Sequence, residues 1–421
     1  MTADLDQAVR AAHERYARTH PRSARAQQRA LAVLPGGNTR SVLHFEPFPF
    51  RAERAEGAEL VDIDGHRYVD FCGNYSAGLL GHEPEAVRAA LRAALDDGMA
   101  IGATREQEID LAERICRRFP GIDQVRFTNS GTEANLMAVG LALHHTGRRT
   151  VGVFDHGYHG GLLAFGELDA PESHPLNVPH PFRLAPFDDV SGLDELFAEP
   201  DLACVLVEMV QGSGGCRPAS PVFLAELRRR CTEHGALLIV DEVMTSRLSP
   251  GGAQELLGVV GDLTTLGKYL GGGLSFGAFG GRRDIMAAFD PAAGGRLTQA
   301  GTFNNNAMTM AAALAVMDAE LTDARLSDVN ERGDRLRVEL NDRFGAAGIP
   351  LWVTGLGSML AFHSADDRIL ELFFHDALEH GLYFARRGFM ALSMEITDAH
   401  TAALVDFASD WCSSQTGSAR S

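Results

Sequence analysis

Short apolar runs alternate with stretches of helical spacing through the middle of the chain, and this alternation limits the possible folds more than any other feature. The segments at residues 124–128, 150–154, 203–208, 237–240 and 263–266 are predicted strands, and the segment at 237–240 is fully apolar. Strands that alternate with amphipathic helices predict an α/β fold, with a parallel or mixed sheet that is covered on both faces. Ligands bind to such sheets beyond the carboxyl ends of the strands, so the polar residues that follow these runs are the first candidates for a site.

The two flanks of the chain have a different pattern. Residues 1–34 have the composition of helices, and residues 59–71 alternate around an Asp-Gly turn, which indicates a hairpin. Long helices return towards the C-terminus. We therefore expect a large domain of residues 76–306 and a smaller α+β domain. The smaller domain combines an N-terminal part, residues 1–75, with a C-terminal part, residues 307–421.

Charge and cysteine content exclude several functions. The 421 residues include 38 Lys and Arg against 56 Asp and Glu, a formal net charge of −18, which repels nucleic-acid phosphates and anionic lipid. The six cysteines are scattered without a Cys-x-x-Cys pair, as in proteins of reducing compartments. The N-terminus lacks the apolar core of a signal peptide, and no apolar run approaches the ~20 residues of a membrane-spanning helix. We expect a cytoplasmic protein that binds neither nucleic acid nor membranes.

The segment from Asn129 to Ala134 lies at a predicted strand-to-helix turn. Ser130 and Glu133 have the spacing of a capping box. The free N–H groups and the dipole at such a turn favour an anion such as phosphate, and Gly131 allows close approach of the backbone. A plain helix cap explains the same residues equally well, so the segment alone leaves both interpretations open.

Two further strands end in residues that can carry chemistry. Asp241 and Glu242 directly follow an apolar strand, where carboxylates are costly unless they are paired. Asp241 could neutralise a protonated ring nitrogen, or it could cap the next turn. Lys268 follows Gly267 after the next strand and could form a Schiff base if its pKa is lowered, although a solvated lysine is the simpler interpretation. A Walker A motif is excluded, because Tyr269 stands where that motif needs Ser or Thr.

Aromatic, imidazole and hydroxyl side chains follow other predicted strands. Tyr158 could stack on a flat cofactor. His156 and His159 could be metal ligands, but no carboxylate or cysteine completes the set, so we expect no metal. Thr302 lies in a polar loop before a helix rich in Ala and Met, where its hydroxyl could bind phosphate or cap the helix.

The order of these motifs is more specific than any one of them. Asn-Ser-Gly-Thr-Glu-Ala, Tyr-His-Gly, Asp-Glu-Val-Met-Thr and Leu-Gly-Lys follow one another along the chain. In this order they resemble the class III pyridoxal-phosphate-dependent aminotransferases of fold type I, which are related to the glutamate-1-semialdehyde aminomutases. The resemblance extends from Pro35 to about Gly388. It implies a large domain with a mostly parallel sheet of seven strands between helices, a smaller α+β domain, and pyridoxal 5'-phosphate as the cofactor.

The resemblance assigns roles to individual residues around this cofactor. It implies that Lys268 binds the cofactor covalently and moves protons, and that Asp241 pairs with the pyridine N–H. Thr302 would reach the phosphate of the neighbouring subunit, which implies a homodimer with shared active sites. Met209 stands where the family usually has proline. The resemblance also implies a shell of residues that contact the phosphate and the ring: Ser130, Gly131, Thr132, Tyr158, His159, Glu208, Gln211 and Val243.

Two arginines are candidate carboxylate clamps, because arginine binds carboxylates in bidentate fashion. Arg40 follows a Gly turn near the start of the small domain, and Arg387 lies near its end. With these segments the sequence looks most like the β-amino acid aminotransferases of the β-phenylalanine type. By this resemblance Arg40 and Val42 bind the β-amino acid, and Arg387 binds the α-carboxylate of 2-oxoglutarate or a similar acceptor. A surface arginine is the alternative at both positions.

The sequence therefore predicts a transaminase that moves an amino group between a β-amino acid, aromatic ones included, and a keto acid such as 2-oxoglutarate or pyruvate by a ping-pong mechanism. Three alternatives stay open. A 2,1-aminomutase of the glutamate-1-semialdehyde type would need no external keto acid, although three asparagines at 304–306 replace the Gly-Asn-Pro typical of aminomutases. A specialised biosynthetic aminotransferase for a cyclic or polyketide-derived ketone would have the same motifs. A cofactor-binding protein without turnover is the third alternative, and the combination of Lys268 with Asp241 argues against it.

Overall fold

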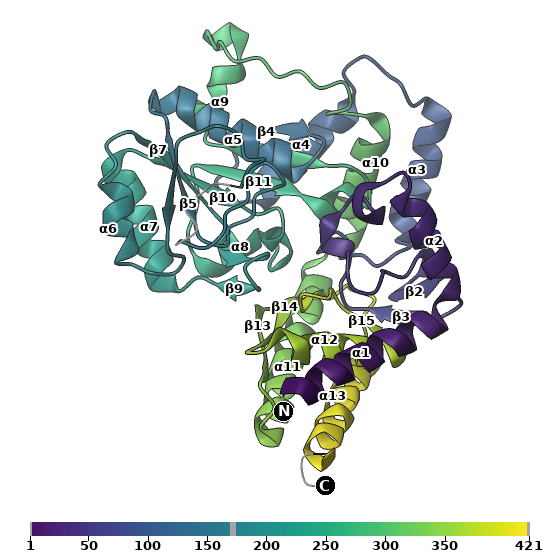
Figure 1. The fold of residues 1–421 in the computed structure, drawn as a ribbon. Helices are drawn as coiled ribbons and strands as arrows, with labels where there is room; N and C mark the ends of the chain where they lie inside the picture. Colours follow the sequence, from purple (N-terminus) through teal and green to yellow (C-terminus); the bar gives the residue numbers. More distant parts are fainter. Residues whose placement is uncertain (1, 169–173, 419–421) are drawn as a thin grey trace. The chain divides into compact units, whose positions relative to one another are not determined.

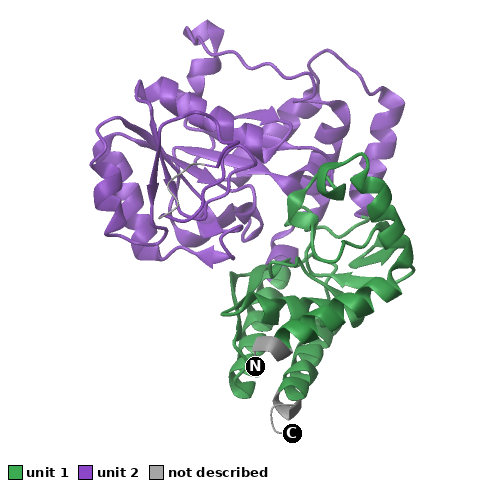
Figure 2. Cartoon of the chain, in the orientation of Figure 1, with its two compact units in different colours: residues 1–83, 328–421 green, residues 84–327 purple. Residues whose placement is uncertain are grey.

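The structure, a computed structural model, describes residues 2–168 and 174–418. These residues form two compact units (Figure 2). Unit 1 consists of residues 1–83 and 328–421, and unit 2 consists of residues 84–327. The expected domain limits at 75/76 and 306/307 remain a proposal. Among the described residues, no helix combines the length and the apolar character needed to cross a bilayer.

Unit 2 is built around one sheet, which confirms the predicted fold class (Figure 1). Strand β12 runs antiparallel to both of its neighbours, and the other neighbouring pairs of this sheet are parallel. The strand order across the sheet is β4 (Gln124–Thr128), β12 (Gly277–Gly281), β11 (Leu263–Gly267), β10 (Leu237–Asp241), β7 (Leu202–Val207), β5 (Thr150–Phe154) and β6 (Phe182–Ala185).

The central strands are apolar because both faces of the sheet are covered. Every residue of β5, β7, β10 and β11 is buried, as expected of strands in a parallel sheet. The small side chains of α5 allow it to lie against β7, β10, β11 and β12. The helices of unit 2 are α3 (Glu85–Asp97), α4 (Glu106–Arg118), α5 (Gly131–Thr146), α6 (Gly192–Phe197), α7 (Pro221–His234), α8 (Gly252–Leu257), α9 (Arg283–Met286) and α10 (Ala307–Ala315).

Helix α7 shows how the sequence sets the limits of an element. Ser220 is the N-cap, and its side chain accepts the N–H of Phe223 at 3.3 Å. Pro221 occupies the first turn, where its missing N–H costs nothing. Gly235 ends the helix in a left-handed conformation, with φ of 69°. These signals set both ends of α7.

Unit 1 joins the two ends of the chain. The predicted hairpin is present as antiparallel β2 and β3, and β3 pairs in parallel with β15 from the C-terminal part. One sheet contains β1 (Ala52–Glu56), β2 (Glu59–Asp62), β3 (Arg67–Asp70) and β15 (Leu382–Tyr383), and a second contains β13 (Leu351–Leu356), β14 (Met359–Ser364) and β16 (Phe389–Ala391). The principal helices are α1 (Thr2–Thr19), α2 (Pro21–Leu31), α12 (Asp367–Glu379), α13 (Asp398–Ser418) and, from Asp328 on, α11 (Asp323–Ala347).

Candidate active site

Asp241, the last residue of β10, lies in the interior with 4% of its surface exposed. Its Oδ2 atom accepts hydrogen bonds at 2.8 Å from Asn135 Nδ2 and from His159 Nδ1, in the tautomer that carries the proton there. Its Oδ1 atom accepts the backbone N–H of Val243 at 2.9 Å. These donors satisfy the oxygens of a polar group that would be costly to bury without partners. The arrangement suits a carboxylate that faces a cation.

Asn135 and Thr265 complete this network, and sequence reasoning missed both. The Thr265 hydroxyl donates to Asn135 Oδ1 at 2.7 Å, and Asn135 Nδ2 also donates to the carbonyl of His159 at 3.1 Å. Both side chains are buried. A buried amide on the apolar face of α5 is the signal that could have identified Asn135, because buried amides need partners.

Lys268 begins η4 (Lys268–Gly271), directly after β11, and is half-buried. In the parallel pairing of β10 with β11, Asp241 lies opposite Thr265, three positions before the lysine. Lys268 and Asp241 therefore follow neighbouring strands at the same carboxyl edge of the sheet. The lysine has a φ of 52°, a conformation that is uncommon for residues with a Cβ atom and that clusters at functional sites.

The start of α5 has the Ser130 half of the predicted capping box, while Glu133 bonds back to the residue before the N-cap. Ser130 Oγ accepts the N–H of Glu133 at 3.1 Å, and Glu133 Oε2 accepts the N–H of Asn129 at 2.9 Å. The first N–H groups of a helix, here those of Gly131 and Thr132, have no partner within the helix. They are available to an anion at the carboxyl end of β4.

Close packing links this helix start to the strands that carry Asp241 and Lys268. A Cβ atom on Gly131 would lie 2.7 Å from Cγ1 of Val243, and one on Gly267 would lie 3.4 Å from the backbone nitrogen of Gly131. Thr132 packs in the same way against Gly160, where no Cβ atom would fit. The start of α5, where we expect the phosphate to bind, and Val243 are therefore neighbours.

The predicted residues after β5 and β7 also meet. The Glu208 carboxylate accepts the N–H of Tyr158 at Oε2 and that of Gly212 at Oε1, both at 3.0 Å. Gln211 Nε2 donates to the carbonyl of Asp155 at 2.6 Å. Burial raises the pKa of Glu208 to about 7. Tyr158 stays 42% exposed, so its ring is accessible for stacking.

Thr302 occupies an exposed position in the loop before α10. This loop contacts the segment before α5, where Asn129 Nδ2 donates a hydrogen bond to Asn304 Oδ1 at 2.8 Å. The role expected for Thr302, at the phosphate of a neighbouring subunit, remains a prediction.

The three predicted substrate residues, Arg40, Val42 and Arg387, belong to unit 1, and all three are exposed. The guanidinium carbons of Arg40 and Arg387 lie 5.4 Å and 5.3 Å from the centroid of the Tyr75 ring. Tyr75 also donates its hydroxyl to the carbonyl of Val42 at 2.6 Å. Unit 1 therefore gathers the candidate carboxylate clamps around one aromatic side chain.

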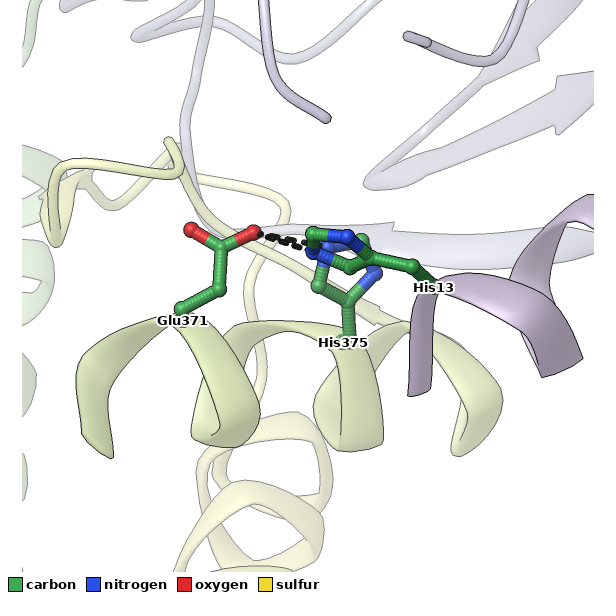
Figure 3. Close-up of side chains that lie close together, drawn as sticks. All are labelled: His13, Glu371 and His375. Carbon is green, nitrogen blue, oxygen red and sulfur yellow. Dashed lines mark hydrogen bonds and ion pairs between the residues drawn. The ribbon is translucent and has the colours of Figure 1, made fainter. Parts of the chain in front are cut away.

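A different cluster of unit 1 joins α1 to α12 (Figure 3). Nε2 of His13 and Nε2 of His375 lie 2.9 Å and 3.0 Å from the same atom, Oε1 of Glu371. Oε2 of Glu371 forms an ion pair with Arg386. Burial raises the pKa of this carboxyl, but hydrogen bonds from His375 and His13 and the charge of Arg386 outweigh it and hold the pKa at about 2. We interpret the cluster as an ion-pair network, since a metal ion would lie beside a guanidinium.

The fold and the strand-end cluster define a fold type I pyridoxal-phosphate transferase. The family model for aminotransferase class-III matches residues 43–410, and the chain belongs to this family. It is similar to the beta-phenylalanine transaminase of Variovorax paradoxus, with 45% identity over 94% of both chains. The crystal structure of a beta-phenylalanine aminotransferase from that organism matches with a TM-score of 0.95 and 44% identity over 98% of both chains. A structure described as a transaminase with PLP bound matches with a TM-score of 0.87 and 30% identity, over 96% of this chain and 99% of the other.

Class III aminotransferases use pyridoxal phosphate, and the residues of unit 2 fit this cofactor. The buried, hydrogen-bonded Asp241 suits a protonated ring nitrogen. The first turn of α5, where Gly131 leaves room for no side chain, suits the phosphate. Lys268 supplies an amine beyond the same strand ends.

Proposed function

We propose that this chain transfers the amino group of a β-amino acid, aromatic ones included, to a keto acid such as 2-oxoglutarate or pyruvate. The observation that carries this proposal is the 45% identity, over nearly the whole of both chains, to a relative named as a beta-phenylalanine transaminase. The two exposed arginines beside Tyr75 support it, because both substrates carry a carboxylate.

In this proposal the residues of unit 2 hold the cofactor and move the proton. When bound, pyridoxal phosphate supplies an electron sink for the carbon that bears the amine. Asp241 holds the proton on the ring nitrogen, and His159 and Asn135 orient the Asp241 carboxylate. Lys268 Nζ takes a proton from the amine-bearing carbon of the donor and gives one to the acceptor carbon.

The remaining residues of the site bind the phosphate of the cofactor and enclose its ring. The phosphate is held by Ser130, Gly131 and Thr132 at the helix start. Tyr158 and Val243 enclose the ring, and Glu208 holds the Tyr158 backbone in place. Gln211 fixes the adjoining loop through the carbonyl of Asp155. These seven residues and His159 are the shell of cofactor contacts that we propose.

The two substrates use one site in turn. Arg40 binds the carboxylate of the β-amino acid beside Val42, and Arg387 binds the α-carboxylate of the acceptor. Because the first keto product leaves before the acceptor enters, we expect ping-pong kinetics. We also propose a cytoplasmic homodimer in which Thr302 serves the site of the neighbouring subunit.

The test is a donor screen on the purified holoenzyme. We expect β-phenylalanine to convert the bound cofactor to its amine form faster than α-phenylalanine or an ω-amine without a carboxylate, and 2-oxoglutarate or pyruvate to convert it back. Arg40→Ala should raise KM for the β-amino acid, because a carboxylate clamp is lost. Conversion by α- or ω-amines alone would refute the substrate class. Turnover of an amino aldehyde without any keto acid would instead show an aminomutase.

A further inference from the structure

A run of left-handed residues lies directly after the first sheet of unit 1. Gly73, Asn74, Tyr75 and Ser76 have φ values of 53°, 46°, 54° and 72°. Only the first of these is a glycine, and residues with a Cβ atom seldom adopt this conformation, least of all consecutively. Such backbone persists where the surroundings over-determine it, which often marks a functional segment.

The surroundings of this turn account for its conformation. Asp70 Oδ1 accepts the N–H groups of Cys72 at 2.9 Å and of Gly73 at 3.0 Å. The carbonyl of Gly73 accepts the N–H of Gly78 at 2.8 Å. A Cβ atom on Gly73 would collide with the carbonyl of Ala391 in β16. The turn is therefore fixed between β3 and β16 before any ligand binds.

The Tyr75 side chain is fixed as firmly as its backbone. It is 8% exposed, and its ring stacks on Phe389 with centroids 5.4 Å apart and planes at 13°. Its hydroxyl donates to the carbonyl of Val42 at 2.6 Å. The ring thus connects β16 with the loop that carries Arg40.

Both candidate clamps, Arg40 and Arg387, contact side chains of this turn. Arg40 and Arg387 have their guanidinium carbons within 5.4 Å of the same Tyr75 centroid, inside the range of cation–π attraction. Arg40 Nη1 also donates to Asn74 Oδ1 at 2.6 Å. A guanidinium that uses its face on a ring keeps N–H edges for a carboxylate.

Ordering of these side chains has a consequence for binding. A mobile arginine loses rotamer freedom when it binds a carboxylate, and this loss weakens the complex. An arginine already held over a ring has lost part of that freedom. Tyr75 contacts both arginines, with Phe389 as a second ring 5.9 Å from the guanidinium carbon of Arg387, and it therefore affects two recognition events at once.

We propose that Tyr75 is a positioning residue that holds Arg40 and Arg387 for carboxylate recognition, so that one ring sets the affinity for both the donor and the acceptor. This inference rests on the proposed function, because it takes the two arginines as the clamps of the two half-reactions. The property to measure is affinity for carboxylates, which is separate from the chemistry at Lys268.

The experiment measures the two half-reactions of the holoenzyme separately. In Tyr75→Leu we expect the apparent KM to rise about fivefold both for β-phenylalanine and for 2-oxoglutarate. Benzylamine, which lacks a carboxylate, should convert the cofactor within about twofold of the wild-type rate. In comparison, Arg40→Ala should affect mainly the donor and Arg387→Ala mainly the acceptor.

Matched variants separate positioning from general loosening. Tyr75→Phe keeps the ring but loses the hydroxyl bond to Val42, so it is the reference for the effect of the ring itself. Pentafluorophenylalanine at 75 keeps the size of the ring and removes its attraction for cations, so it should raise both KM values relative to Tyr75→Phe. Phe50→Leu removes another stacked ring of unit 1, which lies on Tyr68, and should leave both KM values unchanged. If Tyr75→Leu does not fold, the comparison of Phe with its pentafluoro analogue decides the question.

Three results would overturn the inference: an unchanged KM for both substrates, a change in one half-reaction only, or an equal loss with benzylamine. Failure of the proposed function is recognised separately, because β-phenylalanine would then not convert the cofactor of the wild-type enzyme to its amine form. In that case calorimetric titration of the holoenzyme with 3-phenylpropionate and glutarate, which needs no turnover, still tests Tyr75. Weaker binding of both acids in the ring-deficient variants supports the inference, and unchanged binding rejects it.

Discussion

At the residue scale, the buried carboxylate of Asp241 depends on three neighbouring donors. Removing one of them leaves a buried charge less well compensated, at a cost of about 1–3 kcal/mol. We predict that Asn135→Ala lowers the affinity for the cofactor about tenfold to a hundredfold. Equilibrium dialysis of the stripped protein measures this affinity. Asn177→Ala, which removes a half-buried amide that bonds to the backbone of Ala164, is the control and should leave this affinity unchanged.

Lys268 should be indispensable for turnover, because general acid–base steps contribute about 10²–10⁴-fold and this is the amine placed beyond the strand ends. We predict that Lys268→Ala lowers kcat by at least this factor and still binds the cofactor, since Asp241 and the start of α5 are intact. Stopped-flow absorbance with a saturating donor measures the step. Wild-type turnover in this variant would contradict the assignment of the lysine.

Glu208 should make stability depend on pH. Burial raises its pKa from the ordinary 4.5 to about 7, so the folded protein binds more protons than the unfolded chain between these values. Stability from this group is complete below pH 4.5 and is lost as the pH rises to about 7. In the cofactor-free protein we predict that Tm falls less across this window in Glu208→Gln than in the wild type. Parallel Tm curves for the two proteins would show that the carboxyl titrates normally.

At the scale of elements, the start of α5 depends on the absence of a side chain at Gly131. A Cβ atom there would lie 2.7 Å from Val243, so either the helix start or the Val243 loop must shift. We predict that Gly131→Ala weakens cofactor binding at least tenfold. Gly140→Ala, in the same helix with no atom within 4 Å of the new Cβ, should bind the cofactor normally and stabilise the helix by about 0.5–1 kcal/mol. Equal effects of the two changes on the cofactor dissociation constant would argue against phosphate binding at the start of α5.

The elements differ in how far the sequence predicts them. The buried strands β5, β10 and β11 begin at the predicted residues, because strands covered on both faces are continuously apolar. The two-residue strand β15 has no such pattern, and it exists because β3 is available to pair with it. Short pairings of this kind depend on tertiary contacts that a local pattern does not contain.

The same distinction applies within the candidate site. The motifs at Ser130, Asp241 and Lys268 follow predicted strands and are therefore visible in the sequence. Asn135 is hidden because its partner Asp241 lies 106 residues away and is reached only through packing of α5 on β10. The role of Tyr75 is hidden as well, since no local pattern predicts left-handed residues that are held by contacts with β16.

At the scale of the whole molecule, the proposed dimer can be tested by mixing inactive chains. If Thr302 serves the neighbouring subunit, a heterodimer of Lys268→Ala with Thr302→Ala chains contains one complete site. We predict about half of the wild-type activity for this heterodimer, isolated with two different affinity tags. Activity at half the level of the Thr302→Ala homodimer would place Thr302 in the site of its own chain, because only one site of the heterodimer then has its lysine.

Unit 2, residues 84–327, is inserted between the two segments that form unit 1. During synthesis on a ribosome, strand β3 therefore emerges more than 300 residues before its partner β15. Before β15 is synthesised, all strands of unit 2 are already available, so unit 2 can fold first. The apolar faces of the N-terminal helices stay exposed until the C-terminal part of unit 1 is complete. Nascent chains stalled before β15 should consequently recruit chaperones through their first 83 residues, and release after α13 should end that association.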